Sequence, residues 1–128
     1  MNKQLPSQTE KRVNELRDFC YQESTNAGWH TNLETGELLE RNKGEMIALI
    51  HSEVSEMLEG ERKDLMDDKL THRKMAEVEA ADVIIRVLDY CGRWNYDVGG
   101  ALIEKIKFNR ERSDFKLENR KKTNGKKF

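Results

Sequence analysis

The segment from residue 74 to residue 95 constrains the fold more than any other part of this sequence. It has the pattern of one long helix that is apolar around most of its circumference. Its apolar positions are Val78, Ala80, Ala81, Val83, Ile84, Ile85, Val87, Leu88, Tyr90 and Cys91. The remaining face is a narrow polar stripe at steps of three and four, formed by Glu79, Asp82, Arg86, Asp89 and Arg93. Such a helix must be covered on nearly every side, which predicts an all-α core around it.

Residues 44–61 predict a second helix, which is amphipathic. Its apolar arc consists of Met46, Ile47, Leu49, Ile50, Val54, Met57 and Leu58. Glu53 falls inside that arc, and Glu56 lies on its border. In Glu53-Val-Ser-Glu56, as in Glu79-Ala-Ala-Asp82, two carboxylates stand at i and i+3, and this spacing places each pair on one helical face.

Both helices therefore direct carboxylates toward the expected core. A buried, unpaired carboxylate is strongly unfavourable or becomes protonated, so a cluster of Glu53, Glu56, Glu79 and Asp82 needs cations. Two sources fit the sequence. Arginine side chains such as Arg86 could neutralise the cluster, or a hard divalent ion could be bound by the carboxylate oxygens. The position of the carboxylates inside apolar arcs favours the metal.

Two further helices are predicted, at residues 7–26 and from an N-cap at Asp97 to about residue 113. The chain is thus expected to form an all-α, four-to-five-helix antiparallel bundle. Residues 28–43 form a long loop without sustained periodicity, and such loops are often functional. Residues 1–113 are expected to be a single helical domain. Residues 114–128 are a basic tail, for which disorder is the default expectation.

Composition limits the function classes further. The 128 residues support one domain, and 36% hydrophobic residues with a mean hydropathy of −0.90 give only a lean core. We therefore expect a homodimer or homotetramer. The net charge of −1 argues against a nucleic-acid binder, and the lack of a long apolar run predicts a cytoplasmic protein without a membrane partner. Cys20 and Cys91 lack metal-type spacing and are expected to be free, buried thiols.

Two other groups of residues are candidates for ligand contact. Lys105, Asn109 and Arg112 share one helical face and could hold a triphosphate, although a solvated basic face is the simpler interpretation of these residues alone. Trp29 and His30 lie in the long loop and could stack on or hydrogen-bond a nucleobase. Trp29 could equally close the end of the bundle, and the sequence does not separate these two roles.

The paired acidic motifs resemble the signature of the all-α nucleotide pyrophosphohydrolases of the MazG type. In this chain, Glu53-x-x-Glu56 is followed after a gap of 22 residues by Glu79-x-x-Asp82. Dimeric dUTPases and dCTP pyrophosphatases are related to that family. Lys105-x-x-x-Asn109-x-x-Arg112 is similar to its phosphate-contacting segment. The resemblance covers the chain from about residue 27 to the C-terminus and is greatest to short stand-alone bacterial and phage members. Thr71 departs from it, because those members have proline there.

The resemblance implies an enzyme that uses Mg²⁺, with Mn²⁺ as a substitute, to convert NTP or dNTP to the monophosphate and pyrophosphate, in the clearance of surplus nucleotides. It implies that the metal ligands are Glu53, Glu56, Glu79 and Asp82. Glu53 or Glu56 would activate water, and the residues do not decide which of the two does so. Two alternatives stay open: a non-catalytic helical module whose acidic stripes pair across an interface, and a relative of the phosphoribosyl-ATP pyrophosphohydrolases. The preferred base and sugar also stay open.

Overall fold

The computed structural model describes residues 3–112 and 116–128, and over these residues it is all-helical, with no β-strand. The helices are α1 (Thr9–Asn26), α2 (Lys43–Lys63), α3 (Met75–Arg93), α4 (Val98–Glu111) and α5 (Leu117–Arg120). The prediction of an all-α protein is confirmed. Among the described residues, no helix is long and apolar enough to cross a membrane. The expected boundary between residues 113 and 114 lies outside the described residues.

The chain divides into two compact units, and α1 contributes to both. We call Glu15–Tyr96 the central unit, and Met1–Asn14 together with Asp97–Phe128 the terminal unit. The central unit contains all of α2 and α3, so it carries both acidic motifs. The terminal unit contains α4 and α5 and carries the basic residues near the C-terminus.

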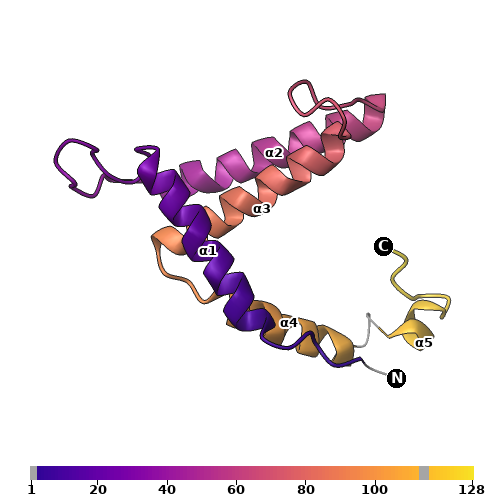
Figure 1. The fold of residues 1–128 in the computed structure, drawn as a ribbon. Helices are drawn as coiled ribbons and strands as arrows, with labels where there is room; N and C mark the ends of the chain where they lie inside the picture. The colour runs from indigo at the N-terminus through magenta and orange to yellow at the C-terminus, as the bar shows by residue number, and fades with distance from the viewer. Residues whose placement is uncertain (1–2, 113–115) are drawn as a thin grey trace. The chain divides into compact units, whose positions relative to one another are not determined.

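Within the central unit, α2 and α3 lie side by side as an antiparallel hairpin (Figure 1). Close contact at the end of the hairpin favours a glycine, because a Cβ atom on Gly60 would lie only 3.0 Å from the side chain of Met75. The connector is fixed by Asp67, a buried residue whose Oδ2 accepts hydrogen bonds from the backbone N–H groups of Lys69 (3.0 Å) and Leu70 (2.7 Å). These contacts set the register between the two helices.

The core of the central unit is small. Its buried hydrophobic side chains are Cys20, Met46, Leu88 and Cys91. Both cysteines are free, as predicted, and burial raises the pKa of each thiol. The near-complete burial expected for α3 is not reached within one chain, because Ile84 and Ile85 are 54% and 48% exposed.

The loop between α1 and α2 begins at a helix C-cap. Gly28 adopts a left-handed conformation (φ 88°), and the backbone N–H groups of Gly28 and Trp29 donate to the carbonyl oxygens of Thr25 and Ser24 in the last turn of α1. The predicted end of this helix at residue 26 is therefore confirmed. Beyond it, the loop closes on itself through an isolated antiparallel bridge between Thr31 and Leu38.

In the terminal unit, Asp97 is the N-cap of α4, as predicted. Its Oδ1 accepts a 2.8 Å hydrogen bond from the backbone N–H of Gly100 and another from the side chain of Asn14. A Cβ atom on Gly99 would lie 2.3 Å from the carbonyl oxygen of Glu10, so the close approach of α1 and α4 requires glycine. The tail contains the short helix α5, which the sequence pattern did not predict.

Candidate metal centre

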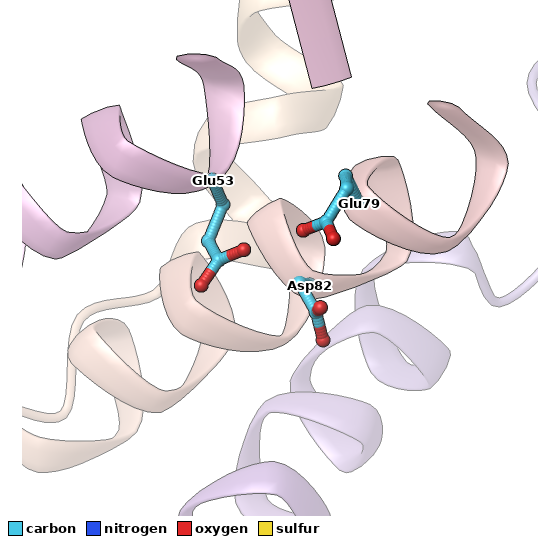
Figure 2. A group of neighbouring side chains, drawn as sticks. All are labelled: Glu53, Glu79 and Asp82. Carbon is cyan, nitrogen blue, oxygen red and sulfur yellow. The ribbon is translucent and has the colours of Figure 1, made fainter. Parts of the chain in front are cut away.

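Three carboxylates meet between α2 and α3. Glu53 comes from the middle of α2, while Glu79 and Asp82 stand one turn apart on α3. One oxygen from each residue can be chosen so that all three lie within 4.8 Å of one another, and each side chain is half-buried. Figure 2 shows the carboxylate of Glu53 directed toward the part of α3 that carries the other two. We call these three residues the acidic triad.

The triad is a consequence of helix pairing. The i, i+3 spacing of Glu79 and Asp82 places both on one face of α3. The antiparallel packing of α2 brings Glu53 opposite that face. Three carboxylate oxygens so close together could hold a metal ion, and as hard oxygen donors they suit a divalent cation that prefers such ligands.

The crowding shifts the protonation of the triad. A side-chain hydrogen bond with Glu53, together with burial and the negative charge of its neighbours, raises the pKa of Glu79 to about 7. The same hydrogen bond, with help from Arg86, lowers the pKa of Glu53. Burial raises the pKa of Asp82. At neutral pH the metal-free triad therefore retains a shared proton for part of the time, and a bound cation would displace it.

Arg86 supplies a cation to one member of the triad. Its Nε donates to Glu53 Oε1 at 2.9 Å, while Glu53 is mostly buried and Arg86 is 41% exposed. This is the arginine partner that the sequence allowed as an alternative to metal. The pairing neutralises one of three carboxylates. In the described chain, no ion pair is found for Glu79 or Asp82, so arginine alone does not balance the cluster.

Glu56, the fourth predicted ligand, lies outside this group. It is exposed on α2, and its charge contributes to the raised pKa of Glu79. The sequence placed Glu56 on the border of the apolar arc of α2, and the packing of α2 against α3 leaves it exposed beside the acidic triad.

A groove of about 910 Å³ opens beside the triad within the central unit. Its lining includes Glu53, Asp82 and Arg86 together with the loop residues Trp29 and Arg41. The remaining lining residues are Leu16, Phe19, Cys20, Glu23, Ser24, Ala27, Glu45, Met46, Leu49, Ile85 and Asp89. One surface thus combines carboxylates, apolar side chains and an exposed indole.

The two loop residues predicted to contact a base occupy different environments. Trp29 is 60% exposed and lines the groove, and the guanidinium of Arg41 lies 6.0 Å from the centre of its ring. His30 is fully buried. Its Nε2 lies 2.7 Å from Asp89 Oδ1, and its Nδ1 lies 3.3 Å from a guanidinium nitrogen of Arg93. In this position the His30 ring offers no face to a ligand.

The sequence did not predict that the side chains of His30, Asp89 and Arg93 contact one another. The stripe on α3 gave a partial signal, because Asp89 and Arg93 are four residues apart and face the same side. It did not show that a histidine from the loop would fill the space between them. His51 and His72 are exposed, as expected for surface histidines.

The predicted phosphate contacts lie on α4 in the terminal unit. Lys105 is exposed, with its ammonium 4.8 Å from the centre of the Phe108 ring. Arg112 donates a 3.2 Å hydrogen bond to Asn109 Oδ1, so two members of the predicted stripe contact each other. A role for Lys105, Asn109 and Arg112 in binding phosphate stays a prediction.

Fold and site together define an all-helical protein with a half-buried carboxylate triad, able to hold a metal ion, at the edge of a groove. Comparison with protein-family models, with curated proteins and with solved structures gave no match for this chain.

Proposed function

We propose that this chain is a metal-dependent nucleoside triphosphate pyrophosphohydrolase of the all-α NTP pyrophosphatase type. One observation carries the proposal. Two members of the acidic triad, Glu53 and Asp82, line the same groove as the exposed indole of Trp29. A nucleotide has the matching chemistry, with phosphates that need a cation and a base that stacks on an aromatic ring. The volume of the groove is within the range of small-molecule sites.

The cation of this proposal is Mg²⁺, with Mn²⁺ as a substitute. Carboxylates and substrate phosphates are the ligands that Mg²⁺ prefers, and this site supplies the carboxylates. Bound there, the ion would neutralise phosphate charge and favour deprotonation of water. Glu53, Glu79 and Asp82 would hold it. The neighbouring Glu56 is exposed and could orient the attacking water as a hydrogen-bond acceptor.

Trp29 would stack against the base. Phosphate binding by Lys105, Asn109 and Arg112 is a separate proposal for the terminal unit, where these side chains could hold an anion. The reaction is attack of water between the α- and β-phosphates, which yields a nucleoside monophosphate and pyrophosphate. Its biological use would be removal of surplus nucleotides.

We further propose that the protein acts as a homodimer or homotetramer. The support is the exposed apolar surface of α3, where Ile84 and Ile85 are about half exposed in the single chain. A second copy would bury that surface, as the apolar pattern of the helix requires. Ile84→Glu is expected to shift the protein to a smaller species in light scattering.

The test is pyrophosphate release from a panel of NTPs and dNTPs, with Mg²⁺ and with EDTA. Glu53→Gln and Asp82→Asn should lose turnover while retaining helicity. Glu61→Gln is the matched control, because Glu61 is an exposed glutamate of α2 outside the triad. Metal-dependent turnover that is lost only in the triad variants would support the proposal. Absence of turnover on every nucleotide, from folded protein, would refute it.

The ion pair between Arg86 and Glu53 favours a second candidate, a non-catalytic helical module. In that case arginines of another chain would neutralise the remaining carboxylates. Mg²⁺ would then leave the free energy of unfolding unchanged, and Glu53→Gln would stabilise the fold or leave it unchanged, without loss of any activity.

A further inference from the structure

We propose that His30 and Asp89 are positioning residues that hold Trp29 at the groove through a buried contact beneath it. Neither needs to take part in the reaction. The proposal rests on the proposed function only for what the groove binds. The fixed position of Trp29 can be tested without any substrate.

Three side chains form the buried contact. His30 Nε2 lies 2.7 Å from Asp89 Oδ1, and Ser24 donates a 3.2 Å hydrogen bond to Asp89 Oδ2. Tyr21 packs against the imidazole, with ring centres 4.7 Å apart. Because His30 is fully buried, solvent cannot replace the contacts of its ring.

The hydrogen-bond pattern assigns the tautomer of His30. A guanidinium only donates, so the 3.3 Å contact from Arg93 requires an unprotonated Nδ1 as acceptor. The ring proton is then on Nε2 and is donated to the carboxylate of Asp89. The assigned form is a neutral imidazole with both nitrogens engaged. An amide oxygen at position 89 could accept the same proton.

Arg93, which also contacts the His30 ring, holds the loop backbone. Arg93 donates to the carbonyl oxygen of His30 at 3.2 Å and also to that of Leu39. The N–H of Leu39 donates to the carbonyl oxygen of His30 at 2.8 Å. Both sides of the loop are therefore tied to α3 at one point, next to Trp29.

Trp29 depends on this anchor because its own ring is held by little else. Trp29 is 60% exposed. Its backbone carbonyl oxygen accepts a 2.8 Å hydrogen bond from Arg41, another loop residue. Loss of the His30 side chain would remove one hydrogen-bond partner from the mostly buried carboxylate of Asp89 and one from the guanidinium of Arg93. The loop would then open locally, and the indole would no longer keep one position.

The experiment uses the full chain with Trp94→Phe, which leaves Trp29 as the single tryptophan. Acrylamide quenching and fluorescence anisotropy report how Trp29 is held. His30→Ala should raise the quenching constant about twofold and lower the anisotropy, as expected for a locally opened loop. Asp89→Asn should resemble the parent, because the amide oxygen accepts the Nε2 proton. His72→Ala, at an exposed histidine, is the control and should also resemble the parent.

If His30→Ala does not fold, His30→Gln decides the question, because glutamine can still donate to Asp89 but has no ring. It should give quenching between the parent and a freely exposed tryptophan. Unchanged quenching and anisotropy in a folded His30→Ala or His30→Gln protein would overturn the proposal. An Asp89→Asn protein as disordered at Trp29 as His30→Ala would overturn the neutral form assigned to His30.

A kinetic measurement separates positioning from structural damage. With a nucleotide that wild type hydrolyses, His30→Ala should raise KM about tenfold and change kcat less than about twofold, since the lost interaction orients the bound base. A fall in kcat without a change in KM would contradict the positioning role. If wild type hydrolyses no nucleotide, the proposed function fails, and the fluorescence result alone decides whether His30 and Asp89 hold Trp29.

Discussion

The central and terminal units carry opposite charge. The central unit contains 10 Lys and Arg residues and 18 Asp and Glu residues, a net charge of −8. The terminal unit contains 13 Lys and Arg residues and 6 Asp and Glu residues, a net charge of +7. The net charge of −1 for the whole chain therefore describes neither unit. Total charge averages over two units of different chemistry, so it does not predict the partners of either unit.

The two units also use their charges differently. In the central unit, packing of α2 against α3 crowds three carboxylates, which raises the pKa of Glu79 to about 7. In the terminal unit, the exposed ammonium of Lys105 lies over an aromatic ring. The central unit has the chemistry of a cation site, and the basic surface of the terminal unit suits an anion.

The largest expected effect is at the acidic triad. Glu79→Gln and Asp82→Asn should each reduce metal-dependent kcat at least about 100-fold, because loss of a ligand removes several kcal/mol of charge stabilisation. Pyrophosphate release would measure this loss. Glu61→Gln should retain activity, and an equal loss there would show that the acidic triad has no special role.

A smaller effect is expected in the terminal unit. Lys105→Ala should lower kcat/KM about tenfold, or about 1.4 kcal/mol, because one charge-assisted phosphate contact is lost. Lys107→Ala is the control on the same helix, off the predicted stripe. Equal effects of the two variants, both abolished by salt, would instead indicate a nonspecific contribution of the positive field.

Substitution of Arg86 tests whether the acidic triad is neutralised by a metal ion or by this arginine. Arg86→Met removes the cation that competes for Glu53, so Mn²⁺ affinity in calorimetric titration should rise about threefold to tenfold. The metal-free protein should be less stable, because Glu53 loses its partner. A fall in metal affinity would mean that Arg86 supports the site instead of competing with it.

The smallest effect is a pH dependence of stability in EDTA. The pKa of Glu79 is about 7 in the folded chain and near 4.5 in the unfolded chain, so the folded state retains a proton that the unfolded state loses. The contribution of Glu79 to the free energy of unfolding is therefore complete below about pH 4.5 and is lost as pH rises through about 7. The lowered pKa of Glu53 acts in the opposite sense, and its stabilisation is lost as pH falls below its usual titration range.

Urea unfolding at about pH 5 and about pH 8 would measure this dependence. Glu79→Gln should show a smaller fall in the free energy of unfolding as pH rises. It should be more stable than wild type at the higher pH without metal. Added Mg²⁺ should reverse that order, because only wild type retains the complete acidic triad. A decline of equal size in both proteins would locate the titrating group elsewhere.

The sequence by itself determined the helices and most of the acidic site. Helical periodicity is a local property, so the apolar arcs of residues 44–61 and 74–95 predicted α2 and α3, and the i, i+3 pairs identified Glu53, Glu79 and Asp82 as inward-facing carboxylates. The N-cap of α4 at Asp97 and the end of α1 before Gly28 could be predicted for the same reason, since each depends only on neighbouring residues.

Only the tertiary structure decided which of these residues meet. The rotation and register of α2 against α3, set by the close contact at Gly60 and by the connector at Asp67, leave Glu56 beside the acidic triad and pair Arg86 with Glu53. The burial of His30 depended on the path of a loop that has no periodicity to read. A local pattern fixes the face on which a side chain lies, but its partner comes from a distant part of the chain, and long-range packing selects it.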